Sequence, residues 1–254
     1  IDEYFKKNVK PTASNYGVTG LLELPTANFL EEASLRFNFS SSYPNEFTSI
    51  VASPFPWLEA SYRYVEVKNK KYGPSTFSGN QSYKDKGFDL KMRIYKSNNF
   101  LPNMALGLRD IAGTGQFASE YLVGTKKIRN LDITLGLGWG AIGSEETFTS
   151  PLSGISKGFS KRTSSQGQGG SFNYADWFSG NASLFGGIEY DLKRYGLRFK
   201  VEYDTSNPDK NLLNPLNVNS RFNYGINYFL SDSLNLGLSY ERGSELRLSL
   251  VITG

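Results

Sequence analysis

The chain has 254 residues, of which 15% are aromatic and 20% are charged, and its mean hydropathy is −0.40. No apolar run reaches the roughly 18 residues that a membrane-spanning helix needs, so no transmembrane helix is expected. The formal net charge of +4 is small for this length and basic residues are mixed with acidic ones, which does not favour nucleic-acid binding. The chain has no His and no Cys, which excludes a Ser-His-Asp triad, thiolate metal ligands, disulfides and a lipid-modified cysteine.

Apolar and polar side chains alternate through segments of about ten residues, from about Leu35 to Ile252, and turn residues separate these segments. In residues 87–95, Phe, Leu, Met and Ile share one face of a strand while Asp, Lys and Arg share the other. A length of about 9 to 11 residues matches a tilted strand that crosses a bilayer, and the aromatic-rich ends are typical of outer-membrane barrels. The pattern predicts an all-β protein, a transmembrane antiparallel up-and-down β-barrel.

The alternation predicts twelve strands, joined by short turns and longer connections in turn. In chain order the strands are 32–41, 46–54, 57–67, 87–96, 103–111, 117–126, 130–141, 181–191, 195–204, 219–230, 233–241 and 244–253. In outer-membrane barrels the short turns face the periplasm and the longer loops face outside. The connections 68–86, 142–180 and 205–218 are therefore expected outside the cell, and an even strand number brings both ends of the barrel domain, 32–254, to the periplasmic side.

Residues 1–31 precede the barrel. They are expected to fold into its lumen or mouth, or to lie in the periplasm. Residues 16–24 also look extended, but a thirteenth strand would place the N-terminus outside. The chain begins at Ile1 without the basic and apolar regions of a secretory signal, and is interpreted as a mature product whose signal was removed, or as a recombinant form.

The alternation also assigns the two faces of the barrel wall. Lipid-facing candidates are Phe37, Phe39, Leu58, Tyr62, Tyr64, Leu106, Leu108, Leu135, Leu137, Trp139, Leu184, Ile188, Phe199, Val201, Tyr224, Ile226, Leu236, Leu238, Leu248 and Leu250. Luminal polar candidates are Arg36, Glu59, Arg63, Asp89, Lys91, Arg93, Arg109, Glu120, Asp132, Glu189, Arg198, Lys200, Glu202, Arg221, Glu245 and Arg247. A charge at the lipid midplane would cost roughly 2 to 4 kcal/mol, so these side chains are expected to point inward. A ladder of cross-strand ion pairs that fills a small barrel is favoured over a pore lining, because no ring of one sign is present.

The connection 142–180 is rich in Ser, Thr, Gly and Gln. Loops of nearly forty residues in compact domains are usually functional or mobile. Its aromatic residues are candidates for stacking on sugar rings, or alternatively for anchoring the loop to the barrel rim. The candidates for sugar contact are Phe172, Tyr174, Trp177 and Phe178.

Catalytic and metal-binding patterns are weak, so no enzyme activity, metal or cofactor is predicted. Glu145 and Glu146 could form a carboxylate pair, whereas Glu202 shares a face with basic residues and favours charge pairing. The glycine-rich stretches lack the strand-to-helix context of a phosphate-binding loop. The acidic segment 204–209 lacks the spacing of an EF-hand and is interpreted as a solvated loop.

Several motifs resemble one known family over about residues 17–252. They are Gly20-Leu-Leu, Pro54-Phe-Pro-Trp-Leu-Glu59, Leu106-Gly-Leu-Arg-Asp-Ile111, Leu135-Gly-Leu-Gly-Trp-Gly140, Leu184-Phe-Gly-Gly-Ile-Glu-Tyr190 and Leu238-Ser-Tyr-Glu-Arg-Gly243. In this order they are similar to the YjbH family of exopolysaccharide- and capsule-associated outer-membrane proteins. The resemblance implies a Gram-negative outer-membrane barrel in polysaccharide secretion, beside a periplasmic polymer-export apparatus. Members often have sequence beyond such a barrel, and several look like lipoproteins, for which this chain has no Cys.

The expected function is therefore participation in the export or secretion of exopolysaccharide or capsule polysaccharide. The alternatives are a structural barrel that scaffolds an envelope assembly and conducts nothing, or a narrow porin. The expected partners are outer-membrane lipid, polysaccharide, and periplasmic or outer-membrane polysaccharide-export proteins.

Overall fold

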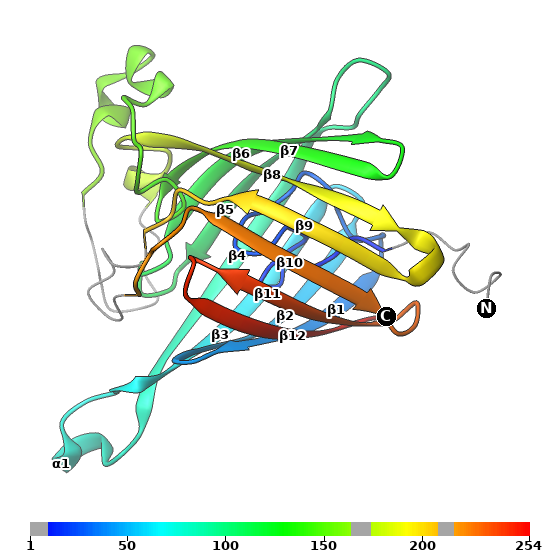
Figure 1. Ribbon diagram of the computed structural model, residues 1–254. Coiled ribbons are helices and arrows are strands. Elements are labelled where there is room, and N and C mark those ends of the chain that lie inside the picture. The colour runs from blue at the N-terminus through cyan, green and yellow to red at the C-terminus, as the bar shows by residue number, and fades with distance from the viewer. Residues whose placement is uncertain (1–9, 164–173, 208–215) are drawn as a thin grey trace.

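Twelve antiparallel strands close into a barrel in the computed structural model, which describes residues 10–163, 174–207 and 216–254 (Figure 1). Each strand pairs with its neighbours in sequence, and β1 pairs with β12. The strands are β1 (Ser34–Ser42), β2 (Asn45–Phe55), β3 (Leu58–Lys71), β4 (Ser82–Tyr95), β5 (Asn103–Ile111), β6 (Ser119–Ile128), β7 (Leu131–Gly140), β8 (Ala182–Leu192), β9 (Leu197–Tyr203), β10 (Phe222–Phe229), β11 (Leu234–Glu241) and β12 (Glu245–Thr253). The predicted all-β barrel and its twelve strands are confirmed.

The largest differences from the predicted strands are at β3 and β4. Both strands continue well past the predicted ends, and Lys71 still pairs with Ser82 after a register shift beyond Val67. A single-turn helix, α1 (Ser75–Ser78), joins them at the tip. About half of the predicted loop 68–86, residues 68–71 and 82–86, is therefore strand, which the sequence did not reveal because this hairpin is polar on both faces.

Apolar side chains cover most of the outer wall, and the burial patterns alternate along the strands. Leu135, Leu184 and Leu248 are 63%, 53% and 64% exposed, respectively. Among the residues that the structure describes, four short 3-10 helices lie in the connections: η2 (Pro151–Gly154), η3 (Lys157–Ser160), η4 (Tyr174–Asp176) and η5 (Lys193–Tyr195). Within the described residues, no helix has the length and apolar character required to cross a membrane.

Residues 10–30, here called the plug, lie inside the barrel (Figure 1). The plug folds into two tight turns, with antiparallel bridges between Ala13 and Thr19 and between Gly20 and Pro25. Gly17 has φ +98°, and a Cβ there would come within 2.0 Å of Oγ of Ser49 on β2. Only glycine permits both this backbone conformation and this approach to the wall.

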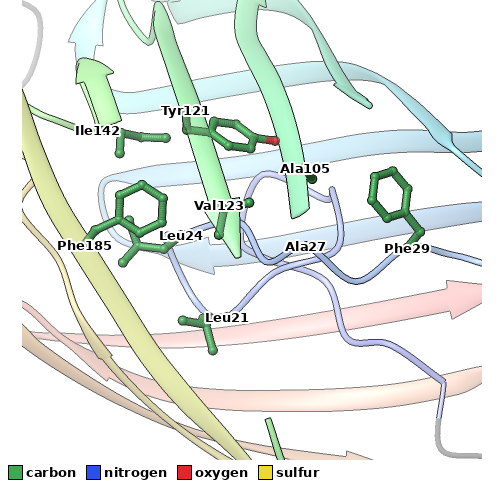
Figure 2. Packing of buried hydrophobic residues seen from close by; sticks show 9 residues of the cluster. All are labelled: Leu21, Leu24, Ala27, Phe29, Ala105, Tyr121, Val123, Ile142 and Phe185. Atoms are coloured by element: carbon green, nitrogen blue, oxygen red, sulfur yellow. The ribbon is translucent and has the colours of Figure 1, made fainter. Parts of the chain in front are cut away.

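An apolar cluster joins the plug to the wall (Figure 2). Its members are Leu21, Leu24, Ala27 and Phe29 of the plug, and Ala105, Tyr121, Val123, Ile142 and Phe185 of the surrounding chain. Gly107 makes room for the Tyr121 ring, whose Cζ would lie 2.1 Å from a Cβ at this position. Burying this apolar surface stabilises the plug within the lumen. The core of this protein is therefore partly inside the barrel, where the sequence predicted only polar side chains.

Candidate functional site: the filled lumen

Glu202 on β9 binds the plug through its main chain. Its carboxylate accepts hydrogen bonds from the amides of Leu22 (3.0 Å), Glu23 (2.9 Å) and Leu24 (3.3 Å). Asn223 on β10 donates a further hydrogen bond from Nδ2 at 2.8 Å. Consecutive amides that converge on a carboxylate form an anion-binding nest, so the plug turn is shaped around this side chain.

Lys200, two residues earlier on β9, binds carbonyl groups of the plug, whereas Glu202 binds amide groups. Its Nζ donates to the carbonyl oxygens of Ala13 (3.3 Å), Gly20 (3.2 Å) and Leu21 (2.5 Å). Glu189 on β8 stands directly opposite Lys200 in the sheet, with a carboxylate oxygen 3.8 Å from Nζ. Glu202 and Lys200 thus satisfy buried amides and carbonyls that no β-sheet or helix pairs.

A second pair, Glu59 on β3 and Lys91 on β4, repeats this arrangement on another part of the wall. Glu59 accepts hydrogen bonds from the amide and hydroxyl of Thr19 (3.0 and 2.7 Å) and from the amide of Leu30 (2.7 Å). Lys91 lies 3.0 Å from Glu59 and donates to the carbonyls of Thr19 (3.1 Å) and Asn28 (2.6 Å). This cross-strand ion pair also binds the plug.

Three other luminal candidates also form hydrogen bonds with the plug. Arg36 donates to the carbonyls of Gly17 and Pro11, and Arg198 donates to the carbonyl of Lys10. Glu189 accepts from the hydroxyl of Thr12 at 2.7 Å. Because the wall binds mainly backbone groups, these contacts depend on the path of the plug more than on its side chains.

Glu23, a charged residue of the plug, forms an ion pair with a residue in a turn between two strands. Oε2 lies 2.8 Å from Arg242, in the turn between β11 and β12, and accepts from the hydroxyl of Tyr16 at 3.1 Å. Burial alone would raise the pKa of Glu23, but the guanidinium groups of Arg242 and Arg247 and the amide of Asn15 outweigh it and hold this pKa at about 2. The carboxylate is therefore ionised at neutral pH and fixes the plug to this turn.

The remaining inward candidates form ion pairs or pack against aromatic rings of the plug. Arg63 pairs with Asp110 (3.2 Å) and Asp89 (3.9 Å), and Arg247 pairs with Glu241 (3.0 Å) and Glu245 (3.6 Å). The guanidinium carbon of Arg109 lies 3.8 Å from the centroid of the Tyr16 ring, and that of half-buried Arg93 lies 4.5 Å from the Phe29 ring. Asp132 accepts from Asn28 of the plug at 2.9 Å.

Two luminal candidates do not point into the lumen. Glu120 on β6 lies opposite Trp139 on the outer face, because its neighbours Tyr121 and Val123 turn inward to the apolar cluster. Its carboxylate binds Arg162 at 2.6 Å and accepts from the amide of Phe178 at 2.9 Å. The prediction that Glu120 is luminal is wrong: it is an outward charge buried beneath the connection between β7 and β8.

Arg221 lies at the rim and outside β10, which begins one residue later, although the predicted strand 219–230 included it. Its side chain is half-buried, donates to the carbonyl of Ser206 at 2.9 Å and lies 3.6 Å from Glu145. It therefore links two connections at this end of the barrel.

The four loop aromatics have different surroundings. Phe178 packs edge-to-face on Trp139, with ring centroids 5.3 Å apart, so it anchors the loop to the outer wall. Tyr174 is 76% exposed and Trp177 is half-buried. Phe172 lies outside the described residues.

Two of the lipid-facing candidates are buried. Trp139 lies under this loop, and its indole nitrogen donates a hydrogen bond to Ser150 at 3.0 Å, so it does not face lipid as predicted. Leu108 is also buried and does not face lipid either.

The sequence reasoning missed the plug residues as partners of the luminal charges, and missed Asn15, Asp110 and Arg242 altogether. The turn-forming Gly and Pro residues between Gly17 and Pro25 were the available signal, because they predict a compact coil in this region. In the part of the chain that the structure describes, no group of three or more Asp and Glu side chains is arranged to hold a metal ion.

Comparisons with solved structures concern the barrel architecture. The KdgM porin gives a TM-score of 0.45 at 10% identity, covering 87% of this chain and 97% of the porin. The NanC porin gives 0.42 at 8% identity, with 87% and 98% covered. Wzi, described as an outer-membrane protein involved in group 1 capsule assembly in Escherichia coli and as a carbohydrate-binding β-barrel, gives 0.29 at 13% identity, with 83% and 52% covered. These values are too low to indicate a ligand or a mechanism.

Comparisons of sequence are more specific. The chain is 39% identical over 251 residues to a protein of Escherichia coli (strain K12) described as the uncharacterized lipoprotein YjbH. This alignment covers 98% of the chain and 36% of the relative, so the chain spans about a third of that relative's length. The family described as "YjbH: Exopolysaccharide biosynthesis protein YbjH" matches residues 12–254. The chain belongs to the YjbH family of exopolysaccharide biosynthesis proteins.

Proposed function

We propose that this chain is a β-barrel of a Gram-negative outer membrane that takes part in the export or secretion of exopolysaccharide, with its lumen closed by the plug. The role is non-enzymatic. The observation that carries the proposal is the binding of plug backbone groups by charged residues on opposite parts of the wall, Glu59 with Lys91 and Glu202 with Lys200. Membership of an exopolysaccharide biosynthesis family supports the process.

The outer wall supports the membrane assignment. Closure of the sheet pairs strand edges, which is the condition for strands to cross a lipid bilayer. Large apolar side chains such as Leu135 and Leu248 stand exposed on this wall, and their burial in lipid would be favourable at roughly 25 cal/mol per Å². Outer-membrane lipid is the partner that this surface fits.

Passage of a polymer through the barrel requires the plug to move, because the plug fills the lumen with both apolar and polar contacts. A periplasmic or outer-membrane export protein that binds the plug is the kind of partner that such movement needs. Exposed Tyr174 and half-buried Trp177 on the long connection are the rings we propose to meet the polysaccharide.

A scaffold that conducts nothing is the second candidate, and the same plug favours it, since many buried contacts hold this segment in place. The two roles predict different effects on polymer secretion when the plug is loosened. A narrow porin needs an open lumen and is the least compatible with the filled barrel.

Deleting the gene and restoring it with variants tests the proposal. We expect the deletion to lower surface or secreted polysaccharide without changing small-solute uptake, and the wild-type gene to restore it. Glu202→Ala, which loosens the plug, should alter polymer secretion if polymer passes through the lumen, and leave it at the wild-type level if the barrel is a scaffold. Normal polymer in the deletion strain would overturn the export role and make the scaffold the leading candidate.

Cysteine labelling tests the orientation, since the chain has no native Cys. We propose that the longer connections face outside and the short turns face the periplasm. A bulky impermeant thiol reagent should label Ile155→Cys on intact cells and spare Asp232→Cys. The opposite labelling would show that the barrel is inverted.

A further inference from the structure

The ends of β3 and β4 extend past the strands beside them. Pairing of β2 with β3 ends at Asn45 opposite Val67, and pairing of β5 with β4 ends at Ile111 opposite Phe88. Residues 68–86, here called the projecting hairpin, therefore continue as two strands and α1 away from the barrel wall (Figure 1). A two-stranded hairpin is only marginally stable by itself, and the side chains on its surface indicate what it could bind.

Positive charge is concentrated on the projecting hairpin. It carries five lysines, Lys68, Lys70, Lys71, Lys84 and Lys86, whereas the net charge of the whole chain is only +4. Its one acidic residue, Asp85, is 2% exposed. Lys68 pairs with Glu46 of β2 at 2.5 Å. Among the residues that the structure describes, the other four lysines form no ion pair with a carboxylate.

Aromatic rings accompany these lysines. Tyr72 and Tyr83 lie across the hairpin from each other, with ring centroids 6.3 Å apart, and Nζ of Lys70 is 5.5 Å from the centroid of Tyr83. Tyr72 is 50% exposed, and Phe77 of α1 is 80% exposed. Tyr72 and Lys70, which lie beside Tyr83 on the inner face of the hairpin, offer an apolar face and a charge to one ligand, a combination that suits a sugar ring carrying an acidic substituent. Lys84 and Lys86 lie on the outer face of β4.

The basic surface begins where the apolar wall ends. Phe88 on β4 packs against Tyr62 on β3, with ring centroids 5.4 Å apart, and both rings lie on the exposed outer face. The next outward positions along β4 are Lys86 and Lys84. In a bilayer that covers the apolar wall, these lysines reach the level of the lipid headgroups.

We propose that the projecting hairpin binds an anionic saccharide, whose phosphate or carboxylate groups meet the lysines while a sugar ring lies against Tyr72 and Phe77. The inference rests on the proposed function only for the location of the hairpin at the cell surface. The same chemistry occurs in an acidic secreted polymer and in the phosphorylated sugars of lipopolysaccharide, and the experiment separates these two sources.

Binding is measured with the full chain purified in detergent, against polygalacturonate, uncharged dextran, lipopolysaccharide, and lipopolysaccharide treated with phosphatase. The test variant is Lys70→Gln/Lys71→Gln/Lys86→Gln. The matched control is Lys96→Gln/Lys193→Gln/Arg194→Gln, which removes the same charge from exposed positions on the short turns. Heat-modifiable migration on gels establishes that both variants retain the barrel.

The wild-type chain should bind polygalacturonate or lipopolysaccharide and leave dextran unbound. The test variant should weaken binding on the order of a hundredfold, which corresponds to roughly 1 kcal/mol for each of its three lysines near an anionic surface, and the control less than about twofold. Loss of binding after phosphatase treatment identifies lipopolysaccharide as the source, and binding of polygalacturonate alone identifies a polymer. Equal weakening in both variants, or equal binding of dextran, overturns the proposal. This assay is independent of polymer secretion, so its failure leaves the export role standing.

Discussion

The inner and outer walls of the barrel both bury charged side chains, but by different means. On the inner wall Glu202 binds three consecutive amides of the plug. On the outer wall Glu120 binds the guanidinium of Arg162 from the connection that folds over β6 and β7. The face of a strand therefore does not decide alone whether a charge is tolerated. The segment that covers the charge, and the groups that this segment supplies, decide it as well.

The largest expected effect is on the inner wall. Glu202→Ala leaves three buried amides and Asn223 without their acceptor, and each buried donor left unpaired costs about 1 to 3 kcal/mol. We expect hydrogen exchange in residues 20–24 to accelerate while the strands stay protected. Glu202→Gln, which keeps one acceptor oxygen, should have a smaller effect, and Glu32→Ala, at an exposed position, none. Unchanged exchange in Glu202→Ala would show that the amide contacts do not hold the plug.

A smaller, local effect is expected on the outer wall. Arg162→Ala leaves the buried carboxylate of Glu120 with the amide of Phe178 as its remaining partner, at a cost of about 2 to 3 kcal/mol. The connection between β7 and β8 should become sensitive to proteases while the plug stays protected. Lys161→Ala is the control at the exposed neighbouring position. Glu120→Gln/Arg162→Ala should recover part of the loss, because no unpaired charge is then buried, and the pairing account fails if the double variant is more sensitive than Arg162→Ala.

The smallest effect concerns pH. The pKa of Glu23 is lowered to about 2 in the folded chain from an ordinary value of 4.5, so its contribution is complete above pH 4.5 and is lost as the pH falls toward 2. Plug protection, corrected for the intrinsic pH dependence of exchange, should decline as the pH falls below about 4.5. Glu23→Gln should reduce protection at neutral pH and flatten the low-pH decline. An identical decline in that variant would assign the effect to other carboxylates.

The sequence predicted the barrel because lipid imposes a strict alternation on the outer face, as the exposed Leu135 and Leu248 illustrate. The same rule misplaced Glu120, since Tyr121 and Val123 are apolar yet face inward against the plug. The plug contacts could not be predicted, because Glu202 and Lys200 bind backbone groups that every residue carries. The long hairpin was missed for a related reason: its lysines and polar residues obey no alternation beyond the apolar wall.

Single-channel conductance in planar bilayers tests the central claim, that residues 10–30 close the lumen, most directly. We compare the wild-type chain with a chain lacking residues 10–30 and with Glu202→Ala. The account predicts no sustained open current for the wild type, a stable open level for the deletion, and intermittent opening for Glu202→Ala. A wild-type chain that conducts at the same steady level as the deletion would contradict the account.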